Sequence, residues 1–153
     1  MRGRANQFWI RLATGLAVLL VSPMAPRATP AEAPSQVQVA RRFLLAVLAG
    51  RNEAAYRLLA SETQARMSAD SFAVAAQPLY AEGQRRGPTI DLYKFGFRMG
   101  DTDTQPFCTF MFRSDTSADK PQVQLDVTFD SSAPREVQGF SLIRQAAATA
   151  PNR

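Results

Sequence analysis

The spacing of apolar residues along the chain changes from a helical period to a strand period. Between residues 35 and 82 apolar side chains recur at steps of three and four, which is the spacing of one buried face of a helix. From Ile90 onwards they alternate with polar residues, as in half-buried strands. Helices that precede strands, rather than alternating with them, predict an α+β fold with about three N-terminal helices packed on one face of a curved four-stranded antiparallel sheet.

The first predicted helix covers about residues 35–49. Ser35 and Gln38 match a capping box, and Gly50 is placed to end the helix in the left-handed conformation. A second helix is predicted over residues 53–60 with Asn52 as its N-cap. Residues 61–67 are ambiguous and could extend it.

A third helix is predicted over residues 69–82, with Ser68 or Asp70 as its N-cap. Pro78 is expected to bend or split this helix because its ring clashes with the preceding turn. Gly83 and Gly87 are expected to end the helical half of the chain.

Four strands are predicted in the second half of the chain. The alternation predicts that one face of the first strand carries Tyr93, Phe95, Phe97 and Met99. The second strand covers residues 107–113, the third 123–129, and a shorter fourth strand contains residues 140–142. The connections are about seven residues long and rich in Asp, Ser, Thr and Pro, which is typical of antiparallel hairpin loops.

Residues 1–33 have the pattern of a signal peptide. A basic start without acidic residues precedes the apolar run of residues 12–21, and a stretch rich in Pro and Ala follows. Cleavage is expected near Ala31 or Ala33, followed by a single α+β domain over residues 34–144 and a disordered tail at 145–153. Because a spanning helix needs about 20 apolar residues, this run is too short to leave a stable membrane span, although an uncleaved anchor is the alternative.

The leader carries most of the excess positive charge. The whole chain has 18 basic and 13 acidic residues, a net charge of +5. Arg2, Arg4, Arg11 and Arg27 precede residue 32, so their removal leaves 14 basic against 13 acidic residues. A near-neutral domain argues against nucleic-acid binding, and the pairs Arg41-Arg42 and Arg85-Arg86 are interpreted as solvated surface.

The residue types present exclude much active-site chemistry. The chain contains no His, which removes His-activated nucleophiles and His-based metal sites. Cys108 is the single cysteine, and its position among aromatic residues of a strand favours packing over reactivity. No catalytic, metal-binding or cofactor-binding residue is predicted.

The chain over about residues 35–143 resembles the NTF2-like, or cystatin-like α+β cone, superfamily. The resemblance rests on a Phe-Leu…Gly…Ala-Tyr-Arg-Leu-Leu pattern over residues 43–59, followed by a third helix and four strands. It implies a cavity between helices and sheet, and it is most similar to small secreted members of unknown function. The polar residues best placed to line such a cavity are Tyr56, Tyr80, Tyr93 and Arg98, with ordinary core packing as the alternative.

These observations predict an exported, non-enzymatic module that binds a small apolar ligand or another envelope protein. Export by the general secretory route would place it in the periplasm or outside the cell. The resemblance also implies a homodimer, since dimers are common among NTF2-like domains and exposed apolar sheet surface would favour one. The alternatives are an enzyme with a Tyr/carboxylate site in the cavity and a membrane-tethered accessory domain. Against the enzyme, Asp126 alternates with core residues and is expected to point to water.

Overall fold

The computed structural model describes residues 33–100, 104–116 and 120–145. Nearly all of the predicted signal peptide and of the predicted tail lies outside these residues. Within them, four helices precede four strands: α1 (Gln36–Leu48), α2 (Asn52–Tyr56), α3 (Ser61–Arg66), α4 (Ala69–Arg86), β1 (Ile90–Met99), β2 (Thr104–Phe112), the 3₁₀ turn η1 (Arg113–Asp115), β3 (Val123–Phe129) and β4 (Val137–Arg144). The predicted α+β class is confirmed.

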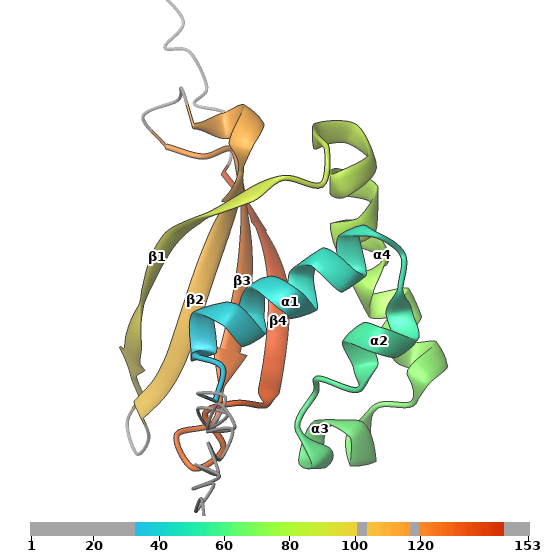
Figure 1. The fold of residues 1–153 in the computed structure, drawn as a ribbon, viewed down its shortest axis with the longest axis vertical. Coiled ribbons are helices and arrows are strands. Elements are labelled where there is room, and N and C mark those ends of the chain that lie inside the picture. Colours follow the sequence, from blue (N-terminus) through green and yellow to red (C-terminus); the bar gives the residue numbers. More distant parts are fainter. Residues whose placement is uncertain (1–32, 101–103, 117–119, 146–153) are drawn as a thin grey trace, which may run out of the picture. The chain divides into compact units, whose positions relative to one another are not determined.

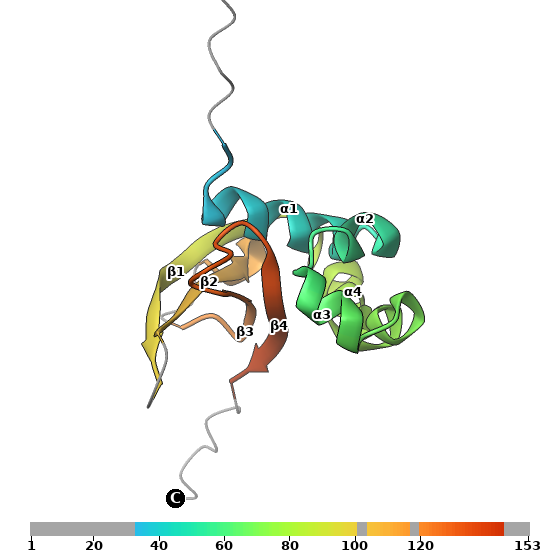
Figure 2. The same ribbon diagram turned by 90° about the horizontal axis from the view of Figure 1, so that it is seen from below.

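The sheet is an antiparallel meander in the order β1-β2-β3-β4. Figure 1 shows α1 lying across the sheet, whereas α2, α3 and α4 lie beyond β4. In the view of Figure 2 the sheet is curved, and β1 is the strand farthest from α2–α4. The segment before α3 also bonds to the start of β4, where the amide of Ala60 donates to the carbonyl of Val137 at 2.8 Å. Of the two edge strands, β1 is therefore the open one.

The core lies between α1, α4 and one face of the sheet. Alternate residues of β2 and β3 point into it because successive side chains of a strand face opposite sides. The rings of Phe43, Phe72 and Phe140 meet there with centroids 5.4 to 6.1 Å apart. These rings fill space between helices and sheet where the resemblance implied a cavity.

Local helix signals are confirmed at two of the three predicted caps. Ser35 and Gln38 form the capping box of α1, and Ser68 rather than Asp70 caps α4. Asn52 is not an N-cap: it is the first residue of α2, and Arg51 stands at the cap without a side-chain bond. The ambiguous residues form the separate helix α3.

The last helix runs four residues further than predicted. α4 contains both Pro78 and Gly83 and ends at Arg86, so Pro78 does not split it. Gly83 is buried against α1, and a Cβ at this position would lie 2.9 Å from Cδ2 of Leu48. Here the glycine allows two helices to approach closely instead of ending one.

A bulge in β1 shifts its alternation. Ile90 and Leu92 pair with Phe112 and Phe110, but the register slips between Leu92 and Lys94. After the bulge, Phe95 pairs with Cys108 and Phe97 with Pro106, both of which are buried. Directly paired residues share a face, so Phe95 and Phe97 lie on the helix-facing side of the sheet.

Candidate functional site

The four residues predicted to line a cavity lie on different elements and have different partners. Tyr56 of α2 belongs to the core packing: its ring lies 5.7 Å from that of Phe72, and its hydroxyl donates to the carbonyl of Met67 at 2.8 Å. Tyr80 is half-buried on α4, with its ring beside Gly50. Tyr93 is exposed at the bulge of β1, where Lys94 Nζ lies 5.6 Å from its ring centroid.

Arg98 is the one member of this set that lines a described cleft. This cleft, of about 480 Å³, lies beside the ends of β1 and β3 and is also lined by Gln105, Asp130 and Gln138. The three tyrosines do not line it. The structure therefore does not gather the four predicted residues into one site.

Asp126 does not point to water as expected. It lies on the face of β3 opposite the helices, yet it is only 2% exposed. The hydroxyl of Thr109 donates to its Oδ1 at 2.6 Å, and Arg98 Nη2 donates to the same oxygen at 2.9 Å. The Arg98 guanidinium also lies 4.5 Å from the ring centroid of Phe107. Side chains of β1 and β2 thus cover this carboxylate of β3 and neutralise it.

Cys108 is buried on the helix-facing side of β2. Burial, together with the negative charge of Asp126, raises the pKa of its thiol to about 11. The thiol is therefore protonated at neutral pH, and a protonated thiol is a poor nucleophile. The prediction that Cys108 packs as a small buried side chain is confirmed.

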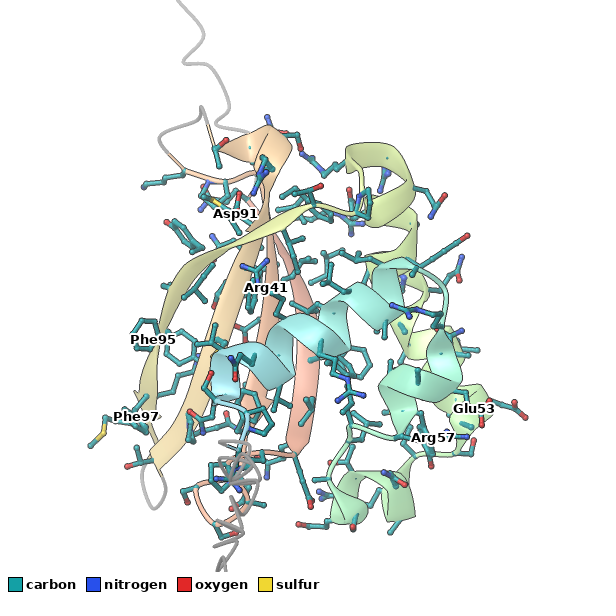
Figure 3. The ribbon with its side chains drawn as sticks, in the orientation of Figure 1. Arg41, Glu53, Arg57, Asp91, Phe95 and Phe97 are labelled. Carbon is teal, nitrogen blue, oxygen red and sulfur yellow. The ribbon has the colours of Figure 1, made fainter. Side chains whose placement is uncertain are left out.

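The most prominent apolar surface lies on the outer half of β1. Phe95 is 69% exposed, Phe97 67% and Met99 83%, and we call these three residues the β1 stripe. Figure 3 shows Phe95 and Phe97 on the part of β1 that extends past α1. The sequence predicted the strand and the shared face, but it did not predict that the helices would leave this part uncovered.

A second candidate site is a cleft of about 950 Å³ between the C-terminal end of α4, η1, the residues just before β3 and the end of β4. Its charged lining residues are Glu82, Arg85, Arg86, Asp115, Lys120 and Arg144, and we call it the cationic cleft. Both of its acidic side chains are buried. Among the side chains described there, four cations against two anions leave a net charge of +2.

Glu82 is the centre of this cluster. Its Oε1 accepts from Arg85 Nη2 at 2.6 Å and from Arg144 Nη2 at 3.0 Å, and its Oε2 accepts from Arg86 Nε at 3.1 Å. Burial by itself would raise the pKa of Glu82, but the hydrogen bonds from Arg144 and Arg86 and the charges of Arg85 and Arg144 outweigh it and lower that pKa. The carboxylate is therefore ionised at neutral pH.

Arg86 connects this centre to the sheet. Its Nη1 donates to Asp115 Oδ1 at 2.6 Å and its Nη2 to Gln122 Oε1 at 3.2 Å, while its guanidinium lies 6.0 Å from the ring centroid of Phe112. The interpretation of Arg85-Arg86 as solvated surface is wrong for Arg86, which is half-buried. The spacing of Glu82, Arg85 and Arg86 on one helix could have indicated the cluster, but Asp115 and Arg144 come from distant segments.

Comparisons with known proteins identify neither a family nor a function for this chain. No family model, no curated protein and no solved structure matches the chain. The NTF2-like resemblance stays a prediction. Among the residues that the structure describes, no helix is long and apolar enough to cross a membrane, and no cluster of three potential metal ligands occurs.

Proposed function

We propose that this chain is an exported, non-enzymatic binding module that contacts protein through β1, and that the partner seated there is a second copy of the chain. The observation that carries the proposal is the exposure of the β1 stripe on the open edge of the sheet. An edge strand offers unpaired backbone groups to another strand, and an apolar stripe adds surface that water disfavours. A contiguous exposed apolar patch of this kind marks an interaction site.

The order of residues along the stripe favours a second copy. In an antiparallel pair of β1 strands centred on Phe97, each Phe95 lies opposite a Met99 and the two Phe97 residues face each other. On the other side of the sheet each Arg98 lies opposite a Gly96, which leaves room for the guanidinium. A register centred on Gly96 would instead place Lys94 opposite Arg98, and like charges directly opposite each other are destabilising.

The non-enzymatic part of the proposal rests on how the polar candidates are used. Tyr56 donates its hydroxyl to backbone carbonyls, and Asp126 accepts from Thr109 and Arg98. In neither case is a tyrosine hydroxyl paired with a carboxylate. Tyr56 and Asp126 thus act in the packing of the fold.

The test of self-association is the mass of the full chain in solution at 1 to 100 µM, measured by light scattering or sedimentation. We expect a dimer. We expect Phe97→Ser to weaken its association at least a hundredfold, because the substitution removes one aromatic side chain from each copy, and burying each side chain contributes roughly 1.5–3 kcal/mol. Val74→Ser is the matched control, since Val74 is 75% exposed but lies on α4.

Two results would contradict the proposal that β1 forms the dimer interface. One is a wild-type chain that stays monomeric throughout that range. The other is a dimer that Phe97→Ser and Val74→Ser affect equally, which would move the interface elsewhere. Circular dichroism of each variant checks that the fold is intact, as expected for side chains that are mostly exposed.

Export has its own test. The pattern of residues 1–33 supports cleavage after Ala31 or Ala33, so the mature chain should begin at Glu32 or Pro34. Mass spectrometry of the protein recovered from the envelope and the medium measures this directly. Retention of Met1 would contradict cleavage and favour the membrane-tethered alternative.

A further inference from the structure

We infer that the cationic cleft is a binding site for a phosphate group carried by a small molecule or a lipid. This site is lined by residues other than those of the β1 stripe, and the inference does not depend on self-association. It rests on the arrangement of charge in the cleft, on the donors that its arginines keep free and on its size.

The charges are arranged with the anions inside and the cations outside. The side chains of Glu82 and Asp115 are 4% and 6% exposed, whereas those of Arg85 and Arg144 are 64% and 56% exposed. Lys120 is also exposed at the rim of the cleft. The charge of +2, summed over the described side chains of the cleft, therefore faces the open space, where it complements a phosphate monoester of about −1.5 to −2.

The arginines are held in place by a shared partner. Three of them donate to the carboxylate of Glu82, which fixes each guanidinium without using all of its hydrogen bonds. A guanidinium has five N–H donors. Arg85 gives one bond to Glu82 and Arg144 gives two from Nε and Nη2, so both keep donors for a ligand.

Arginine suits this ligand better than lysine would. Its planar fork of donors matches the oxygens of phosphate and carboxylate in pairs. Because Arg85 and Arg144 are positioned before a ligand arrives, less side-chain entropy is lost on binding. The volume of about 950 Å³ is that of sites for whole small molecules rather than for a single ion.

The first experiment is calorimetry of the full chain with inorganic phosphate at pH 7 and constant ionic strength. We expect saturable binding that acetate at the same concentration does not reproduce. Arg85→Gln and Arg144→Gln should each weaken it about tenfold or more, since each removes charge-assisted hydrogen bonds. Arg66→Gln is the control: it removes the same charge from an exposed pair on α3, and it should leave binding unchanged.

Glu82→Gln separates positioning from simple charge attraction. This variant raises the net charge of the cleft by one, so a purely electrostatic surface would bind phosphate more tightly. We expect weaker binding instead, because the three arginines lose the carboxylate that orients them. Tighter phosphate binding by a folded Glu82→Gln variant would contradict a site in which Glu82 orients the arginines. If the Glu82→Gln variant does not fold, the loss of phosphate binding in Arg85→Gln is the test of the site.

Vesicles distinguish the two sources of the phosphate group. Phosphatidylcholine vesicles with and without phosphatidic acid are sedimented with the full chain. Binding that requires phosphatidic acid and is displaced by inorganic phosphate identifies a lipid headgroup, whereas calorimetric binding without vesicle binding identifies a soluble phosphorylated ligand. The absence of both, equal binding of acetate, or an equal loss in Arg66→Gln and Arg85→Gln would overturn the inference.

Discussion

Cys108 illustrates how a single residue acquires its chemistry from its surroundings. Its pKa is raised from 9.0 to about 11 by burial and by Asp126. We expect the native thiol not to react with Ellman's reagent at pH 8 and to react fully in 6 M guanidinium. A fast reaction in the native state would contradict the burial.

The same shift has a consequence for stability at high pH. The thiol ionises in the unfolded chain near pH 9, before it ionises in the folded one near pH 11. Deprotonation therefore favours the unfolded state in this interval, and the free energy of unfolding should fall as pH rises through it. Cys108→Ala should lose this part of the pH dependence.

Asp126 is the second residue whose role depends on its neighbours. Asp126→Ala leaves the buried hydroxyl of Thr109 without an acceptor, so we expect it to lower the free energy of unfolding by about 1–3 kcal/mol. Urea denaturation measures this loss. Adding Thr109→Val to Asp126→Ala should cost little more, because both partners of the bond are then gone. Glu53→Gln, in an exposed pair, should change stability by less than about 0.5 kcal/mol.

At the scale of elements, helix caps provide a direct contrast. The hydroxyl of Ser68 accepts from the amide of Ser71 at 3.2 Å, whereas Asn52 follows a cap position that makes no side-chain bond. Ser68→Ala should therefore lower the free energy of unfolding by about 1 kcal/mol, and Asn52→Ala should leave it nearly unchanged. Equal losses would mean that Asn52 caps α2 in solution.

The strands were predictable as elements, but their faces were predictable only in part. Alternation from Val123 to Phe129 predicted β3 with its observed bounds. In β1 the bulge after Leu92 puts Phe95 on the same side as Ile90, an effect that depends on pairing with β2. The alternation of apolar and polar residues along one strand does not show where a bulge will change the face on which the following side chains lie.

At the scale of the whole molecule, the cluster around Glu82 connects α4 to β4 and, through Arg86, to the segment before β3. Because its pKa is lowered in the folded state, Glu82 contributes stability above its ordinary pKa of 4.5, and this contribution is lost as pH falls through the folded value. We expect Glu82→Gln to reduce the loss of stability between pH 5 and pH 3, measured by urea denaturation. Glu53→Gln should keep the wild-type dependence.

The two proposed binding surfaces also belong to this scale. The β1 stripe is exposed because α1 crosses the sheet elsewhere and α2–α4 lie beyond β4 (Figures 1 and 2). The cationic cleft exists because the ends of α4 and β4 meet: Glu82 and Arg144 are 62 positions apart in sequence. No local pattern links two residues at that separation.

The sequence by itself determined the fold class, the order of the elements and two helix caps. These follow from local rules, since periodicity, capping and residue type act over a few neighbouring positions. Only the tertiary structure decided which apolar face stays uncovered, that Asp126 is buried and that three arginines gather around two carboxylates. Each of these depends on where distant segments come to lie, because burial and charge pairing are set by neighbours in space.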